Sequence, residues 1–348
     1  MDTPRPAVLI LAAGRGTRMK SEKPKVLHKL LGRPLIEHVL NAALYLGPAK
    51  VVLVTGFQAE DVEADVRAFM GELRDRRGAP AVPEPLFARQ TEQLGTGHAV
   101  AMAREHLRDF SGPLVIMYGD MPLISPNTLD GFLKAHQALR ADLSVLTVRL
   151  DDPAAYGRII RDEQGWLKRI VEFRDADEAE RLVREINSGL YVAEASRIYE
   201  AIERLTPDND QGEYYLTDVV ADFRAHGLTA AAVEIPENLD YEVRGINDRY
   251  ELAEAQAILK DRLNESWMRA GVTMMDPLST LIEPSVRLSA DVVLWPNVIL
   301  SGRCQIGSGA EIGPFCHLHN CIVEAGTRVK GQQILSDQSL GINGISLK

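Results

Sequence analysis

The chain has 348 residues, of which 45% are hydrophobic and 25% are charged, and its formal net charge is −10. This composition predicts a soluble globular protein of two domains, or of one large domain with an appendage. The acidic balance argues against a nucleic-acid partner, because a surface that follows phosphates normally leaves a basic excess. No apolar run approaches the roughly 20 residues that cross a bilayer, and the N-terminus lacks the basic start of a signal peptide. Three cysteines, all late in the chain, imply no disulfide framework, so we expect a cytoplasmic protein with no membrane partner.

A buried strand near the N-terminus leads into a basic, glycine-containing loop. The apolar run at 8–11 is followed by two alanines and Gly14, which is typical of a parallel strand that opens into a loop. From Arg15 to Arg33 there are seven Lys or Arg residues against one acid, Glu22. Glycines let the main chain approach a ligand closely, and unpaired N–H groups there can bind phosphate. The loop therefore predicts a polyphosphate site.

Two familiar phosphate loops do not fit this segment. The dinucleotide fingerprint needs a third glycine where this chain has Met19, and the P-loop pattern is absent. A basic surface loop after a core strand stays open as the structural alternative.

Alternating helical and strand patterns follow. A helix is predicted over 35–46, a buried strand over 51–54, a helix over 61–70, a loop over 78–85 and a helix over 98–107. This alternation predicts a parallel sheet with crossover helices.

A third buried strand begins at Leu114 and ends in Tyr118-Gly119-Asp120. Ligands of open parallel sheets sit at the carboxyl ends of the strands, so Asp120 is a natural magnesium ligand for a bound polyphosphate. The alternative is that Asp120 only begins a turn before Pro122.

The last part of the chain carries a six-residue repeat. After a predicted helix over 250–270, aliphatic residues recur every six positions from Ile282 to Leu318, and small apolar residues follow most of them by four. This pattern predicts a left-handed parallel β-helix of about three turns, with a one-residue slip near Val323. Cys304 and Cys316 fall on its small inward positions, so packing explains them better than metal or redox chemistry does.

The segment LAAGRGTRMKSEKPKVLHKLLGRP resembles the signature of the sugar-1-phosphate nucleotidyltransferases. It is similar in detail to the uridylyltransferase half of the bifunctional N-acetylglucosamine-1-phosphate uridylyltransferase/glucosamine-1-phosphate acetyltransferase family. The resemblance covers nearly the whole chain. It implies an α/β fold: a Rossmann-like, mostly parallel nucleotidyltransferase (pyrophosphorylase) domain over 1–248, a linker helix over 249–271 and a short left-handed β-helix over 272–348.

The resemblance also implies roles for individual residues. It assigns catalysis to Arg18, Lys25 and Asp120, and a magnesium ion to Asp120 and Asn247. An N-cap of the following helix is the alternative role for Asn247. The resemblance assigns nucleotide binding to Leu11, Ala12, Ala13, Gly14, Gln90, Gly95 and Thr96. The side-chain amide of Gln90 suits the imide edge of uracil. The resemblance assigns the other substrate contacts to Tyr118, Gly119, Gly157, Glu172, Asn187 and Asn247. The alternative for residues 95–97 is a plain glycine-rich turn. The alternative for Gly157, Glu172 and Asn187 is ordinary surface polarity.

The activity so implied converts UTP and N-acetylglucosamine-1-phosphate to UDP-N-acetylglucosamine and pyrophosphate, for cell-envelope (peptidoglycan) precursor synthesis. The alternatives are a glucose-1-phosphate thymidylyl-, uridylyl- or adenylyltransferase, and a non-catalytic regulatory subunit that binds sugar nucleotide. In the family the β-helix runs on for more turns, which hold the acetyl-transfer chemistry, so acetyltransferase activity is expected to be absent here. A homo-oligomer, such as a trimer through the β-helix, is the one protein partner that the resemblance suggests.

Overall fold

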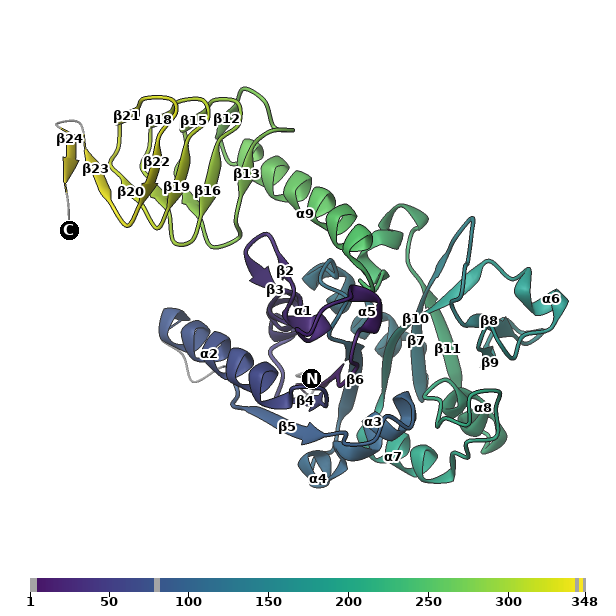
Figure 1. Cartoon of the computed structure of the whole chain (residues 1–348). Helices are drawn as coiled ribbons and strands as arrows, with labels where there is room; N and C mark the ends of the chain where they lie inside the picture. The colour runs from purple at the N-terminus through teal and green to yellow at the C-terminus, as the bar shows by residue number, and fades with distance from the viewer. Residues whose placement is uncertain (1–4, 78–81, 342–343, 347–348) are drawn as a thin grey trace. The chain divides into compact units, whose positions relative to one another are not determined.

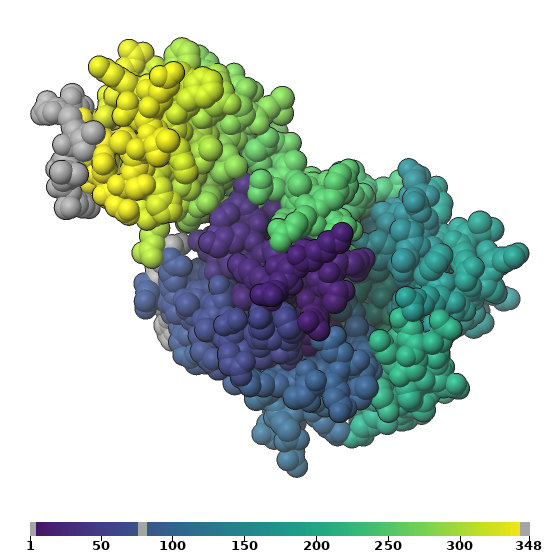
Figure 2. Space-filling model, in the orientation of Figure 1, coloured from purple at the N-terminus to yellow at the C-terminus, as the bar shows by residue number. Residues whose placement is uncertain are grey.

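The computed structural model describes residues 5–77, 82–341 and 344–346 (Figure 1). The chain forms two compact units, one of Met1–His28 with Leu35–Asp248 and one of Lys29–Pro34 with Arg249–Lys348. Figure 2 shows a space-filling view of the chain in the orientation of Figure 1. No helix in the described part of the chain combines the length and the apolar character that a membrane span requires.

A nine-stranded sheet forms the centre of the first unit. Its main path runs in the order β11 (Ala230–Glu234), β7 (Leu143–Arg149), β10 (Glu185–Glu194), β6 (Pro113–Tyr118), β1 (Ala7–Ala12), β4 (Lys50–Thr55) and β5 (Pro85–Arg89). Two further strands, β8 (Arg158–Arg161) and β9 (Leu167–Val171), pair antiparallel with each other, and β8 also pairs with β10. β1 is parallel to β4 and β6, whereas β10 is antiparallel to β6 and β7. The predicted mostly parallel, Rossmann-like sheet is confirmed.

Helices cover both faces of this sheet because successive strand residues point to opposite sides. Val8 and Ile10 pack in a cluster with α1 (Leu35–Leu44), α2 (Ala59–Arg77) and α5 (Pro126–Leu139). Leu9 packs on the other face with α3 (Thr96–Met102), α7 (Ala195–Arg204) and α8 (Asp218–Ala225). The remaining short helices of this unit are α4 (Arg104–Leu107), α6 (Glu178–Arg181) and the 3-10 helices η1 (Thr17–Met19), η2 (Lys25–Leu27) and η3 (Glu237–Val243).

Three local features differ from the sequence-based expectation. The loop predicted over 78–85 lies partly outside the described residues, and its last residue, Pro85, already begins the edge strand β5. A proline is tolerated there because the first residue of an edge strand need not donate to the ladder. The helix predicted over 98–107 is split into α3 and α4 at Ala103. The helix α5 was not predicted, although Ser125 caps it and Pro126 starts it.

The second unit contains a parallel β-helix. In Figure 1 the strands of successive turns lie side by side in three sheets. The first sheet contains β12 (Thr273–Met274), β15 (Val293–Leu294), β18 (Glu311–Ile312) and β21 (Arg328–Val329). The second contains β13 (Leu281–Ile282), β16 (Ile299–Ser301), β19 (His317–His319) and β22 (Ile334–Ser336). The third contains β14 (Arg287–Leu288), β17 (Gln305–Ile306), β20 (Ile322–Val323), β23 (Ser339–Gly341) and β24 (Gly344–Ser346).

The register of these strands confirms the predicted repeat and its slip. Leu288 pairs with Ile306, which pairs with Val323, so the turn shortens from 18 residues to 17 where the slip was predicted. Cys304 and Cys316 are buried in the core, as expected for packing residues. The first strand of the β-helix begins at Thr273, and β24 runs antiparallel to β23.

The helix α9 (Arg249–Arg269) and a small hairpin complete the second unit. The buried Asn264 on α9 donates to the carbonyls of Pro277 (2.9 Å) and Thr280 (3.0 Å). The hairpin consists of β2 (Lys29–Leu30) and β3 (Arg33–Pro34), and α1 begins at the residue directly after it.

Candidate active site

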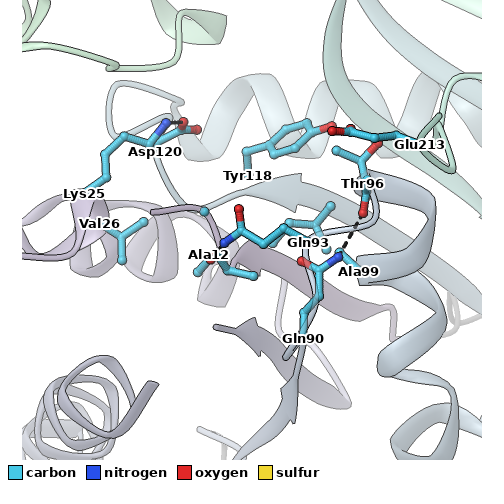
Figure 3. A pocket seen from close by; sticks show the side chains of 14 residues that line it. Ala12, Lys25, Val26, Gln90, Gln93, Thr96, Ala99, Tyr118, Asp120 and Glu213 are labelled. Carbon is cyan, nitrogen blue, oxygen red and sulfur yellow. Dashed lines mark hydrogen bonds and ion pairs between the residues drawn. The ribbon is translucent and has the colours of Figure 1, made fainter. Parts of the chain in front are cut away.

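A cavity of about 300 Å³ lies at the carboxyl ends of β1 and β6 in the first unit (Figure 3). The register places Leu11 beside Tyr118, so the loop after β1 and the residues after β6 emerge at the same edge of the sheet. The cavity is lined by Leu11, Ala12, Ala13, Gly14, Lys25, Val26, Gln90, Gln93, Gly95, Thr96, Ala99, Tyr118, Asp120 and Glu213. Its position matches the rule that ligands of α/β sheets bind beyond the carboxyl ends of the strands.

Lys25, at one end of this cavity, contacts side chains from two other segments that are distant in sequence. Its ammonium pairs with the carboxylate of Asp120, which follows β6, and donates to Oδ1 of Asn247 at 3.2 Å. Asn247 follows η3, and the backbone N–H of Ile246 donates to the carbonyl of Asp120 at 2.9 Å. The chain after η3 is thereby fixed against the end of β6.

The oxygen pair at Lys25 fits a hard divalent cation. One carboxylate oxygen and one amide oxygen bind the same ammonium, so the fold already places a positive charge between them. Over the described residues there is no group of three or more His, Cys, Asp or Glu side chains that could hold a metal. Mg²⁺ needs no such group, because it usually takes one or two protein ligands and completes its shell with water and substrate phosphates.

Two glutamines shape another part of the cavity. Gln90 follows β5 and is 6% exposed; its Nε2 lies 3.0 Å from the carbonyl of Gly95 and 3.1 Å from Nδ1 of His98. Gln93 donates to the carbonyl of Ala13 at 2.9 Å and so fixes the loop after β1. The peptide at Gly95 has φ +105°, and a Cβ there would stand 2.6 Å from the carbonyl of Tyr214. Only glycine fits that position.

Tyr118 lines the cavity and lies near a second polar cluster, which includes Glu172. Burial raises the pKa of its phenol, and the negative charges of Glu172 and Asp120 raise it further. The ring packs against Gly189, where a Cβ would stand 2.2 Å from the ring edge. The phenol of Tyr118 is therefore neutral at physiological pH, and its ring lies directly against Gly189.

Glu172, Gly157 and Asn187 come together in this second cluster. The backbone N–H of Asn187 donates to the carbonyl of Gly157 at 2.9 Å, and the hydroxyl of Thr217 donates to Glu172 at 3.2 Å. Burial is the main cause that raises the pKa of Glu172 above its ordinary value. The hydrogen bond from Thr217 lowers this pKa, whereas the charges of Asp218 and Asp175 raise it.

The other assigned residues fall outside the cavity lining. Gly119 lies behind it, where its N–H donates to the carbonyl of Leu11 at 2.9 Å. Arg18 is exposed on η1. Of the cavity residues, Val26, Gln93, Ala99 and Glu213 were not singled out from the sequence. Glu213 belongs to a segment that holds the Gly95 loop in place: the N–H of Tyr214 donates to the carbonyl of Leu94 at 2.8 Å.

Comparisons with known proteins identify the family. Residues 8–220 match the family described as the MobA-like NTP transferase domain. A bifunctional protein GlmU of Syntrophotalea carbinolica is 43% identical over 330 residues, which cover 94% of this chain and 67% of that protein. The chain belongs to the GlmU family. The GlmU proteins of Bacillus velezensis and Cutibacterium acnes are 40% and 44% identical, over 96% and 88% of this chain and 69% and 72% of their own lengths.

Membership of the GlmU family confirms that the chain is a nucleotidyltransferase, as the resemblance of the loop after β1 implied. A solved structure of UDP-glucose pyrophosphorylase complexed with UDP-glucose is also similar, with a TM-score of 0.57 and 19% identity. It covers 74% of this chain and 99% of its own, and at this identity it supports the fold alone.

Proposed function

We propose that this GlmU-family chain is a UDP-N-acetylglucosamine pyrophosphorylase and that the cavity at the ends of β1 and β6 is its active site. The observation that carries the proposal is the meeting of Lys25, Asp120 and Asn247 beside the Leu11–Gly14 backbone. This places a cation and two oxygen ligands next to a loop suited to nucleotide binding.

The reaction is an in-line displacement at phosphorus. An oxygen of the sugar phosphate attacks the α-phosphorus of UTP, the bond to the β-phosphate oxygen breaks, and pyrophosphate leaves with that electron pair. A phosphate monoester is largely dianionic at neutral pH, so no side chain has to remove a proton. The chain's task is to bring two polyanions together and to balance the charge that builds on pyrophosphate.

Named side chains serve that task in the proposal. Lys25 lies in the cavity and contacts the phosphates, and Arg18 reaches them from the exposed η1. Asp120 and Asn247 would hold the Mg²⁺ ion on which GlmU-type enzymes generally depend. The bound ion would neutralise charge on the α-phosphate and the sugar phosphate.

The sugar is assigned to the cluster beyond Tyr118. Glu172 and Asn187 supply a carboxylate and an amide for sugar hydroxyls and the N-acetyl group, with Gly157 leaving room between them. A Cβ at Gly157 would be in ordinary contact, at 3.5 Å, with both carboxylate oxygens of Glu172, so Gly157 lies beside that carboxylate.

The testing experiment follows pyrophosphate release from pure protein with Mg²⁺, UTP and N-acetylglucosamine-1-phosphate. Glucose-1-phosphate runs in parallel as the other sugar, with dTTP and ATP as the other nucleotides. We expect a strong preference for UTP with the N-acetylated sugar. Preference for glucose-1-phosphate would overturn the roles of Glu172 and Asn187, and no turnover with any pair would favour a regulatory, sugar-nucleotide-binding subunit.

Two wider expectations belong to the same proposal. The cytoplasm is the proposed location, and the three cysteines, all free, agree with a reducing compartment. A trimer through the β-helix is the proposed assembly, and sedimentation would then give three times the 38.4 kDa chain mass.

A further inference from the structure

Arg158, the first residue of β8, carries a guanidinium that is surrounded by backbone carbonyls. The residue is 2% exposed, and its side chain is charged at any physiological pH. Its Nε donates to the carbonyl of Arg181 at 3.4 Å, and its Nη2 donates to that of Ala154 at 2.9 Å. Its Nη1 donates to the carbonyls of Pro153, at 3.3 Å, and Tyr156. Four of the five N–H groups of the guanidinium are thus used on the chain itself.

This buried charge fixes the shape of the loop before β8. Removal of a guanidinium from water costs free energy, and an apolar side chain of similar volume is often no less stabilising. An apolar side chain, however, could not fix the direction of four carbonyls. One of them belongs to Ala154, whose φ of +42° is uncommon for a residue other than glycine. The arrangement therefore indicates a loop that has to keep one backbone conformation.

The strand partners of Arg158 lead directly to the sugar cluster. Arg158 pairs with Ile186 on β10 and with Val171 on β9. The residues that follow these two partners in sequence are Asn187 and Glu172, both assigned to the sugar. The backbone of Arg158 therefore lies between the two strands that carry the amide and the carboxylate of this cluster.

Gly157 and Phe173 complete the connection. Gly157 directly precedes Arg158, and its carbonyl accepts the N–H of Asn187 at 2.9 Å. Phe173 directly follows Glu172, and the centroid of its ring lies 5.4 Å from the Arg158 guanidinium. Each of the three residues assigned to the sugar is thus next in sequence to Arg158 or to a residue that Arg158 contacts.

We propose that Arg158 is a positioning residue that sets the geometry of the sugar pocket and thereby the affinity for N-acetylglucosamine-1-phosphate. The inference rests on the proposed function. Arg158 is almost fully buried and does not line the cavity, so it acts through Gly157, Glu172 and Asn187 and not on the substrate itself. Hydrogen bonds weaken steeply when their geometry changes, so a small shift of this backbone lowers sugar affinity.

The nucleotide side should not feel this change. The carbonyls that Arg158 binds all lie within residues 153–181, whereas the proposed nucleotide contacts lie within 11–14 and 90–96. A positioning role therefore predicts a KM that rises for the sugar phosphate alone. Loss of folded protein, by contrast, lowers the apparent kcat and leaves both KM values unchanged.

Two variants and one control test this split. Arg158→Met keeps the aliphatic stem and removes every donor. Arg158→Lys keeps the charge, but its compact ammonium has three donors and lacks the planar fork that reaches four carbonyls. Arg5→Met is the matched control, because Arg5 also donates to backbone carbonyls, those of Gly47 (2.7 Å) and Pro48 (2.9 Å), far in sequence from the sugar cluster. KM and kcat are measured for each substrate with Mg²⁺, below the melting temperature of every variant.

We expect R158M to raise the KM for N-acetylglucosamine-1-phosphate about tenfold and R158K about threefold, with the KM for UTP unchanged in both. R5M should keep both KM values. A sugar-phosphate KM that does not rise in R158M, or a KM for UTP that rises by the same factor, overturns the positioning role. If thermal melting shows that R158M is unfolded, R158K carries the same test by the same criteria.

Binding without turnover separates this proposal from the proposed function. Calorimetric titration with UDP-N-acetylglucosamine and with UTP should show that R158M weakens the first about tenfold and leaves the second unchanged. An unaltered protein that binds UDP-N-acetylglucosamine but releases no pyrophosphate would refute the enzyme, and the titrations would still decide the role of Arg158. An active enzyme whose R158M variant keeps its sugar-phosphate KM would refute the role of Arg158 alone.

Discussion

Lys25 illustrates how single residues set up the candidate site. Its ammonium holds oxygens from two segments, Asp120 and Asn247, that are far from it in sequence. Its side chain and that of Asp120 are 15% and 17% exposed, so the pair is partly shielded from water. Shielding strengthens electrostatic interactions with a bound polyphosphate.

Replacement of Lys25 should therefore remove most of the activity. Lys25→Met keeps the aliphatic stem but removes the charge, and we expect kcat/KM for pyrophosphate release to fall about 10²-fold or more. Lys23→Met is the matched control, because Lys23 is exposed and does not line the cavity. A near-normal rate in K25M, or an equal loss in K23M, would contradict the assignment.

The charge state of Glu172 should make the stability of the folded protein depend on pH. Its folded-state pKa lies above the ordinary value, so folding favours the protonated form. The stability that this group contributes is present below its ordinary pKa and is lost as the pH rises through the folded-state pKa. Glu172→Gln, which stays neutral, should melt at a higher temperature than the unaltered protein at pH 7, and the difference should vanish as the pH falls toward the ordinary carboxyl pKa.

The same variant should bind the sugar phosphate more weakly, with a KM raised about tenfold for the loss of a charged hydrogen-bond acceptor. Glu163→Gln is the control, because Glu163 is exposed in a turn. Melting curves across pH, together with the KM values, test both parts. A lower melting temperature for E172Q at pH 7 would show that the charged form is the one that folding favours.

For single residues, the sequence predicted those whose side-chain type itself carries the chemistry. Lys25, Asp120 and Gln90 line the cavity as the resemblance implied. Their roles in binding and catalysis stay predictions. Gln93 was missed because it acts on Ala13, and such a contact depends on how the loops after β1 and β5 meet in space.

At the level of elements, a buried side chain of α9 is hydrogen-bonded to the start of the β-helix. Asn264 uses both amide hydrogens on the carbonyls of Pro277 and Thr280, and it is 1% exposed. The loop between β12 and β13 thus has two of its carbonyls satisfied by a helix residue.

Asn264→Ala should destabilise the second unit by about 2 kcal/mol, because two hydrogen bonds are lost and two carbonyls are left buried. Gln256→Ala, an exposed amide on the same helix, should change stability very little. Urea unfolding followed by tryptophan fluorescence is a suitable measurement, since Trp267 and Trp295 belong to this unit. Equal midpoints for the two variants would refute the anchoring role.

Periodic patterns predicted the elements well, and local exceptions were harder to see. The six-residue repeat carried enough in-phase positions to locate even the shortened turn at Val323. β5 was missed because its proline and the loop composition before it hid a strand of only five residues. The split at Ala103 has no marker in the sequence, since alanine favours helix.

Over the whole molecule, charge is distributed unevenly. The chain carries −10 overall, yet Arg15, Arg18, Lys20 and Lys23 lie exposed in the loop after β1. An anionic substrate would be repelled by the body of the protein and attracted by this loop.

Salt should therefore weaken UTP binding. Between about 50 and 500 mM NaCl we expect the KM for UTP to rise several-fold, as the Debye length falls well below the size of the loop. The double variant Arg15→Gln/Lys20→Asn should show a flatter dependence on salt. Steady-state kinetics at several salt concentrations provide the measurement, and parallel dependences for the two proteins would exclude steering by this loop.

The hairpin β2–β3 has a consequence for how such a protein can be recombined. The chain leaves the first unit after His28 and returns at Leu35, whose N–H donates to the carbonyl of His28 at 3.0 Å. In between, Gly32 has φ +80° and lies so close to Glu283 that a Cβ would stand 2.3 Å from its carboxyl group. A single crossover at Asp248 would thus join a foreign β-helix to a hairpin shaped for the original one. A working chimera has to exchange two stretches together, the six residues from Lys29 to Pro34 and everything after Asp248.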